Sequence, residues 1–283
     1  MTTDKVTPEL GRWILQQVRS GQSPEALVQP MLGSGWDAPA AIAAIEQALR
    51  GNIEQDPYAN GLPDPVAVPA PIGLNGRAIV EAAGRPVQVL ASMRDPRIIV
   101  FGSLLSDDEC DQLVALARNR VARSATVNQQ TGIDEVHAGR TSEGTFFERG
   151  AHGVCDRIES RIAALLDWPV DHGEGLQVLR YGPGAQYKPH YDYFDPEKPG
   201  TASVLARGGQ RVASLVMYLN TPTHGGATTF PDAKFEVAPI KGNAVFFSYD
   251  RPHPMTRTLH GGAPVIEGEK WVATKWLRQH HHE

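Results

Sequence analysis

Cysteine is almost absent from this sequence of 283 residues, which holds only Cys110 and Cys155. Two cysteines give no sign of a disulfide framework or of a thiolate metal cluster. No apolar run approaches the length that spans a bilayer, and the N-terminus lacks a basic stretch followed by an apolar one. We therefore expect a cytoplasmic protein with neither a membrane association nor a secretory signal.

An excess of basic residues is also missing. The chain has 27 Lys and Arg against 32 Asp and Glu, a net charge of −5. This balance argues against binding nucleic acid through a large basic surface. A hydrophobic content of 41% and a charged content of 21% are typical of soluble globular proteins. The length allows one sizeable domain and a small one.

Residues 1–55 predict a small all-α module. Helix N-caps are expected at three positions, Thr7, Ser23 and Asp37. Pro30 is expected to end the second helix early, because proline cannot donate a helical hydrogen bond. Ile42, Ile45 and Leu49 are expected to share one face of the third helix. By analogy, such a module more often binds a partner or dimerises than catalyses.

The rest of the chain divides into a linker and a second domain. Five prolines within residues 56–72 indicate a semi-extended linker. Residues 73–283 form the predicted second domain, which opens with strands at 85–93 and 96–105 and helices at 107–121 and 153–168. After Trp168, many short strands separated by Gly, Pro and Asn predict a barrel or jelly roll with the two helices packed outside it.

Residues 187–196, YKPHYDYFDP, place a histidine and an aspartate two positions apart. In an extended strand, residues i and i+2 point to the same face. His190 and Asp192 are therefore expected to aim an imidazole nitrogen and a carboxylate oxygen at one point. Such a pair can bind a metal, act as an acid–base pair or form a structural hydrogen bond. Tyr191 and Tyr193 alternate away from it.

The C-terminal part supplies further candidates. His260, before a Gly-Gly turn, would complete two imidazoles and one carboxylate. This set is typical of non-haem Fe(II) oxygenases, and it also suits a hydrolytic zinc site. Lys270 and Lys275 are five residues apart in the last strand, so only one can point inward. A buried lysine needs an anion, and the far carboxylate of a dicarboxylic cosubstrate such as 2-oxoglutarate would provide one.

Four segments together resemble the catalytic domain of prolyl 4-hydroxylases, members of the Fe(II)/2-oxoglutarate dioxygenase superfamily: YGPGAQYKPHYDYF, GGATTFP, KGNAVFF and HGGAPVIEGEKWVATKWL. The resemblance runs roughly from Pro96 to Arg278 and leaves residues 1–72 outside. It implies a mainly β fold with helices, in which a double-stranded β-helix, or jelly roll, forms a core at about residues 174–278.

The resemblance also implies roles for single residues. His190, Asp192 and His260 correspond to the iron ligands, which are the catalytic centre. Lys270 corresponds to the residue that binds 2-oxoglutarate, with Tyr181 near the cosubstrate. Three residues are implied at the substrate, Arg140, Tyr187 and Trp276. Two polar segments, 128–144 and 195–210, are expected to be loops over the site.

The implied reaction converts 2-oxoglutarate and O2 to succinate and CO2 and hydroxylates a prolyl residue of a peptide or protein, with Fe(II) as metal and ascorbate as reductant. Aromatic residues around the site, Tyr191, Tyr193, Tyr249 and Trp276, suit a polyproline-II segment or simple packing. Three alternatives stay open: a catalytically silent barrel that binds a ligand or partner, an oxygenase with a non-prolyl or small-molecule substrate, and a zinc hydrolase.

Overall fold

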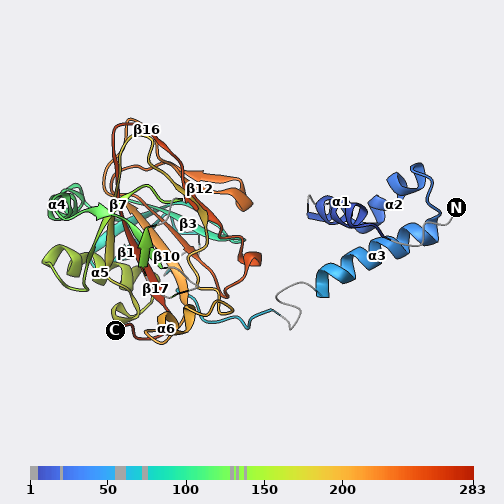
Figure 1. Cartoon of the computed structure of the whole chain (residues 1–283). Coiled ribbons are helices and arrows are strands. Elements are labelled where there is room, and N and C mark those ends of the chain that lie inside the picture. Colours follow the sequence, from blue (N-terminus) through green and yellow to red (C-terminus); the bar gives the residue numbers. More distant parts are fainter. Residues whose placement is uncertain are drawn as a thin grey trace. The chain divides into compact units, whose positions relative to one another are not determined.

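The structure, a computed structural model, describes residues 6–19, 22–54, 62–71, 76–127, 131, 134–136 and 139–283. The chain divides into two compact units, Met1–Pro63 and Asp64–Glu283 (Figure 1). Part of the expected linker, residues 56–61 and 72, lies outside the described residues. Among the helices in the described part of the chain, none has the length and apolar character needed to cross a membrane.

The first unit consists of three helices, α1 (Pro8–Arg19), α2 (Pro24–Gly33) and α3 (Ala38–Glu54). The expected caps are confirmed at Thr7, which accepts a hydrogen bond from Leu10 N at 3.3 Å, and at Asp37, which accepts one from Ala40 N at 2.8 Å. Ser23 caps α2 in the same way. These caps satisfy amide groups that the first helical turn leaves without an intrahelical partner.

One expectation for this unit is wrong, and another holds only in part. Helix α2 continues through Pro30 to Gly33, because burial of Leu27 and Met31 in the small core outweighs the one hydrogen bond that proline cannot donate. Ile45 is buried and Leu49 packs against the same core, as expected, whereas Ile42 is 48% exposed. The buried face of α3 is instead formed mainly by small residues at helical spacing, Ala41, Ala44, Ile45 and Ala48.

The second unit is built on a nine-stranded antiparallel sheet. In spatial order its strands are β1 (Ile79–Ala82), β2 (Arg85–Met93), β3 (Arg97–Gly102), β14 (Ala244–Ser248), β10 (Arg211–Tyr218), β17 (Lys270–Arg278), β8 (Leu176–Tyr181), β7 (Glu143–Phe147) and β4 (Ala122–Arg123). The last strand of the chain, β17, lies between β10 and β8 in the middle of this sheet. Lys270 and Trp276 are therefore carried by a central strand.

Two helices, α4 (Asp107–Arg118) and α5 (Gly153–Leu166), cover one face of the large sheet, as predicted (Figure 1). Helix α4 starts with the expected capping box, in which Glu109 N donates to Ser106 Oγ and Ser106 N donates to Glu109 Oε2. Apolar side chains of both helices and of the sheet form one buried cluster. This face is thereby closed to solvent, and the site lies on the other face.

A four-stranded sheet packs on that other face. Its order is β13 (Phe235–Val237), β12 (Thr228–Phe230), β15 (His260–Gly262) and β9 (Tyr187–His190). Side chains from both sheets, among them Phe230 and Phe247, form a second buried cluster. Two antiparallel sheets around a shared core form the predicted jelly roll. Its two sheets bring β9 and β15 opposite β10 and β17.

The remaining elements are short. They are β5 (Ala125–Val127) with β6 (Asp134–Val136), β11 (His224–Gly225) with β16 (Val265–Glu267), α6 (Thr201–Leu205), and the 3-10 turns η1 (Val170–His172), η2 (Pro231–Ala233) and η3 (Pro254–Thr256). Of the expected loop 128–144, residues 128–130, 132–133 and 137–138 lie outside the described residues. The expected loop 195–210 is partly helical, because α6 buries Thr201 and Val204.

Candidate active site

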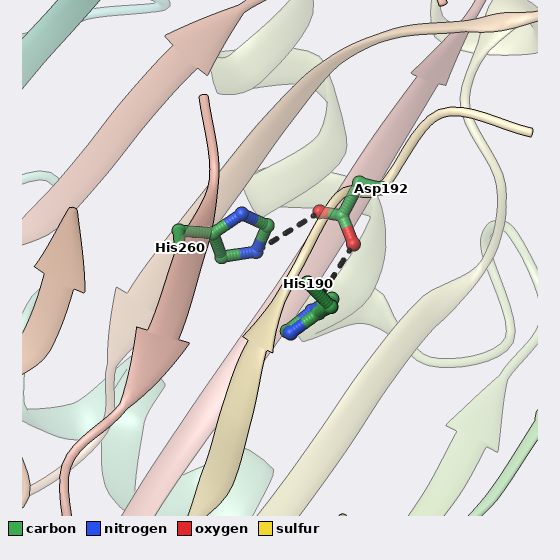
Figure 2. Close-up of side chains that lie close together, drawn as sticks. All are labelled: His190, Asp192 and His260. Carbon is green, nitrogen blue, oxygen red and sulfur yellow. Dashed lines mark ion pairs between the residues drawn. The ribbon is translucent and has the colours of Figure 1, made fainter. Parts of the chain in front are cut away.

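Two neighbouring strands of the small sheet bring together His190, Asp192 and His260 (Figure 2). His190 ends β9 and pairs across the sheet with His260 at the start of β15. Asp192 Oδ1 lies 3.5 Å from His190 Nε2, and Asp192 Oδ2 lies 3.5 Å from His260 Nε2. One donor atom from each residue lies within 4.8 Å of the others, which is close enough for one metal ion to contact all three.

The expected placement of His190 and Asp192 on one strand needs a correction. Strand β9 ends at His190, and Asp192 follows in a bend. The bend lets the carboxylate reach between both imidazoles, rather than only lie beside the first. Tyr193 does pack away from the pair, in the core between the sheets together with Tyr249. These two tyrosines thus serve packing rather than an exposed aromatic surface.

Both imidazoles are oriented by main-chain carbonyl groups two residues earlier. His190 Nδ1 donates to Lys188 O at 2.9 Å, and His260 Nδ1 donates to Thr258 O at 3.0 Å. A carbonyl oxygen only accepts hydrogen bonds, so the proton of each neutral ring is held on Nδ1 and Nε2 keeps its lone pair. Burial lowers the pKa of His260 to about 4, so this ring is neutral at physiological pH.

The carboxylate is held in its charged form. Burial alone would raise the pKa of Asp192, but His260, His190 and Arg211 lower it, and the net pKa is well below the usual value. Ser214 Oγ donates to Asp192 Oδ2 at 2.6 Å and lies 3.0 Å from Tyr249 Oη. The three donors therefore combine one fixed anion with two imidazoles whose Nδ1 atoms face main-chain carbonyl groups.

Lys270 lies in a small cavity beside the three donors. The cavity, about 50 Å³, is lined by residues that include Lys270, Tyr181 and all three donors. Lys270 is 3% exposed, pairs across the sheet with Tyr181, and has its Nζ 5.4 Å from the centre of the Tyr181 ring. Within the described residues it forms neither an ion pair nor a hydrogen bond, and burial lowers its pKa to about 8.

Lys275, by contrast, is already paired. Its Nζ contacts Glu159 on α5, so its side chain points to the helix-covered face of the sheet. The prediction that the two lysines of β17 face opposite sides is therefore confirmed. Lys270 is the lysine on the inner face. Of these two lysines, it is the one that has no anionic partner among the described residues.

A larger groove of about 620 Å³ adjoins the donors and is lined by the three predicted substrate residues. Arg140 donates to Gln177 Oε1 at 2.7 Å and its guanidinium lies 4.9 Å from the centre of the Tyr187 ring. Tyr187 stacks on His190, with ring centres 3.7 Å apart. Trp276 lies under the guanidinium of Arg211 at 3.9 Å. Aromatic and guanidinium surfaces therefore line the groove together with His190 and Asp192.

The sequence analysis did not single out several groove residues, among them Glu174, Gln177 and Arg211. Arg211 donates to both carboxylate oxygens of Glu174, at 2.7 and 2.8 Å. The two residues are 37 positions apart, so no local pattern links them. Ser214 was missed as well, although a polar residue on the inner face of the otherwise apolar β10 is a signal that was available.

Two imidazoles, a carboxylate and a buried cation without a counter-ion fit the mononuclear non-haem Fe(II) oxygenases that use 2-oxoglutarate. The comparisons agree with this class. The 2OG-Fe(II) oxygenase superfamily matches residues 176–278. Prolyl 4-hydroxylase 2 of Arabidopsis thaliana is 39% identical over 68% of this chain and 70% of that protein. Prolyl 4-hydroxylase 1 of the same plant is 42% identical over 65% of this chain and 69% of its own.

Among solved structures, the viral collagen prolyl hydroxylase of Paramecium Bursaria Chlorella virus-1, in complex with 2-oxoglutarate, is 33% identical with a TM-score of 0.49, covering 64% of this chain and 95% of that one. On the strength of the curated relatives, the chain belongs to the prolyl 4-hydroxylase family of 2OG-Fe(II) oxygenases. It is a dioxygenase that uses Fe(II), 2-oxoglutarate and O2.

Proposed function

We propose that the chain hydroxylates a prolyl residue of a peptide or protein while 2-oxoglutarate and O2 become succinate and CO2. One atom of O2 enters the C–H bond and the other enters succinate, so the reaction balances. The observation that carries this proposal is the buried, unpaired cation of Lys270 in the same cavity as the three donors. The curated relatives, named as prolyl 4-hydroxylases, support the substrate.

We propose that His190, Asp192 and His260 hold the iron, which together with 2-oxoglutarate activates O2 for insertion into a C–H bond. The chain's own part is to present two Nε2 lone pairs and one carboxylate from a buried wall. Zinc would suit the same donors, so metal content and dependence on O2 separate an oxygenase from a hydrolase.

We assign Lys270 to the far carboxylate of 2-oxoglutarate and Tyr181 to the wall of the same cavity. A carboxylate at Nζ would give the lysine the ion pair that it lacks among the described residues. Arg140, Tyr187 and Trp276 are assigned to the peptide, because they line the groove that leads to the donors. Arg140 and Trp276 are buried and Tyr187 is half-buried, and such firmly packed aromatic and guanidinium groups suit an extended proline-containing segment.

The first test is an anaerobic titration of the metal-free protein with Fe(II) and then 2-oxoglutarate, followed by visible absorption. A weak charge-transfer band that appears only with both additions is the expected result. Succinate formation is then measured with a proline-containing peptide, with free proline and with neither. Succinate formation that is stimulated by the peptide but not by free proline supports the prolyl assignment. A band without any stimulated turnover would favour the silent barrel, and stimulation by free proline would favour the small-molecule alternative.

The affinity for 2-oxoglutarate is expected to fall as the pH rises above 8. The pKa of Lys270 is lowered to about 8 in the ligand-free protein, and pairing with a carboxylate raises it again. Binding therefore needs a proton above pH 8 but not below it. Between pH 7 and pH 9 the KM for 2-oxoglutarate should rise about tenfold. In Lys270→Arg the charge persists throughout this range, so a rise of the same size in that variant would contradict the assignment.

Replacing Ser214 with alanine is expected to weaken Fe(II) binding by about ten- to a hundredfold, the usual cost of losing a hydrogen bond to a metal ligand. The hydroxyl fixes Asp192 Oδ2, and without it the carboxylate can rotate away from His260. Isothermal titration with Fe(II) under anaerobic conditions measures the effect. Ser203→Ala, on α6, is the control, because among the described residues the Ser203 hydroxyl bonds only the neighbouring carbonyl of Gly200. Equal iron affinity in both variants would refute a positioning role for Ser214.

We propose that the N-terminal helices recruit the protein substrate or mediate dimerisation. Their compact core, separate from the catalytic unit, supports a module with its own task. Deletion of residues 1–55 is expected to slow turnover of a protein substrate severalfold and to spare a short peptide. Equal losses on both substrates would indicate a structural role instead.

We further propose ascorbate as the reductant and the cytoplasm as the location. Stimulation of turnover by ascorbate over many cycles tests the first proposal. Two free, buried cysteines, Cys110 and Cys155, support the second.

A further inference from the structure

The groove beside the donors is strongly positive for an acidic chain. Its described lining includes five basic residues, Arg123, Arg140, Lys188, Arg207 and Arg211. It includes only two acidic residues, Glu174 and Asp192. The chain as a whole carries a net charge of −5. Positive charge gathered in a groove of such a chain indicates a partner of opposite charge.

Both acidic residues of the groove are already engaged by neighbouring side chains. Glu174 accepts hydrogen bonds from Arg211 and, at 3.2 Å, from Arg278. Asp192 belongs to the three donors and is flanked by both imidazoles. Neither carboxylate is therefore available to balance Lys188 or Arg207. Both of these side chains are exposed, and within the described part of the chain neither takes part in a hydrogen bond or an ion pair.

Lys188 and Arg207 are not needed to bind 2-oxoglutarate. The inner cavity that holds Lys270 is lined by neither Lys188 nor Arg207. Lys188 is two residues before His190 on β9, and Arg207 follows α6 and precedes Arg211, whose guanidinium packs on Trp276. They reach the groove from different elements, one from the small sheet and one from the turn before β10. A ligand lying along the groove would meet both.

We propose that the prolyl substrate is an acidic peptide, with Asp or Glu close to the target proline, and that Lys188 and Arg207 select it. This proposal rests on the proposed prolyl hydroxylation and adds a charge requirement to it. Each exposed ion pair contributes little by itself, and two together suffice for roughly a tenfold preference.

The test compares three peptides that share one proline-containing sequence and differ only in having Glu, Gln or Lys at the flanking positions. Their Kd values are measured anaerobically on the full chain loaded with Fe(II) and 2-oxoglutarate. We expect the Glu peptide to bind roughly tenfold more tightly than the Gln peptide, and the Lys peptide to bind most weakly. The preference should shrink between 50 and 300 mM salt, because exposed charges are screened.

Substitutions of Lys188 and Arg207 test whether these two residues cause the preference for the Glu peptide. Lys188→Gln and Arg207→Gln should each reduce the preference for Glu over Gln two- to threefold, and Arg207→Glu should strengthen binding of the Lys peptide. Lys198→Gln removes an exposed charge that does not line the groove and should change nothing. Equal affinities of the three peptides, an inverted order, or no binding of any of them would overturn the proposal.

The Kd values do not depend on turnover, so this proposal and the proposed function fail separately. Tight binding of the Glu peptide without peptide-stimulated succinate formation would contradict prolyl hydroxylation and leave the charge preference standing. Hydroxylation of all three peptides with equal Kd values would support prolyl hydroxylation and contradict the charge preference.

Discussion

Alanine in place of His190 is expected to abolish 2-oxoglutarate-dependent turnover and to weaken Fe(II) binding more than a hundredfold. The loss exceeds the ten- to a hundredfold that follows when only a partner of a metal ligand is removed. Two donors would remain, Asp192 and His260, and the contact of 3.5 Å between Asp192 Oδ1 and the His190 ring would be lost. His190 ends its strand and is partly exposed, so its removal should not unfold the protein. Thermal unfolding of the metal-free variant checks this point.

His224→Ala is the control for this variant, because His224 is an exposed histidine on β11, outside both cavities. Added imidazole offers a second check. The space left by the His190 ring opens to the large groove, so free imidazole can enter and partly restore Fe(II) binding. Full turnover by His190→Ala in an iron-dependent assay would remove the residue from the metal site and with it the proposed donor set.

The jelly roll and the three donors were predictable from the sequence because their signals are local. Short strands between turn residues predicted the two sheets, and His190, Asp192 and His260 stood out through their spacing and their resemblance to a known pattern. Local signals also failed where packing prevailed. Pro30 stays inside α2, because Leu27 and Met31 on either side of it are buried. Ile42 is exposed on α3, because small residues form most of the buried face there.

The surroundings of the donors could not be predicted, because they depend on contacts between distant segments. Ser214 reaches Asp192 from another sheet, 22 positions along the chain. Arg211 meets Glu174 and Trp276 only when β10 and β17 lie side by side. Periodicity predicts which face of a strand or helix a side chain lies on, but it does not predict which residue of another segment that side chain contacts.

Methionine in place of Lys270 is expected to raise the KM for 2-oxoglutarate by two to three orders of magnitude, with a much smaller effect on Fe(II) affinity. Removing one partner of a buried ion pair typically costs 3–5 kcal/mol, and the proposed pair with the cosubstrate is of this kind. Lys270 is 3% exposed, so water cannot take the place of the ammonium group. Steady-state kinetics over a wide range of 2-oxoglutarate concentration gives the KM.

The same substitution should leave the ligand-free protein at least as stable as the original. Burial lowers the pKa of Lys270 from 10.5 to about 8, so keeping its charge at pH 7 costs roughly 3 kcal/mol of folding free energy. Methionine removes this cost, and 2-oxoglutarate should no longer raise the unfolding temperature. Lys275→Met is the matched control on the same strand. It leaves Glu159 buried without its cation, so it should destabilise the protein by several kcal/mol and spare the KM for 2-oxoglutarate. An unchanged KM in Lys270→Met, or a loss of stability in it like that of Lys275→Met, would show that Lys270 is a structural cation rather than the partner of the cosubstrate.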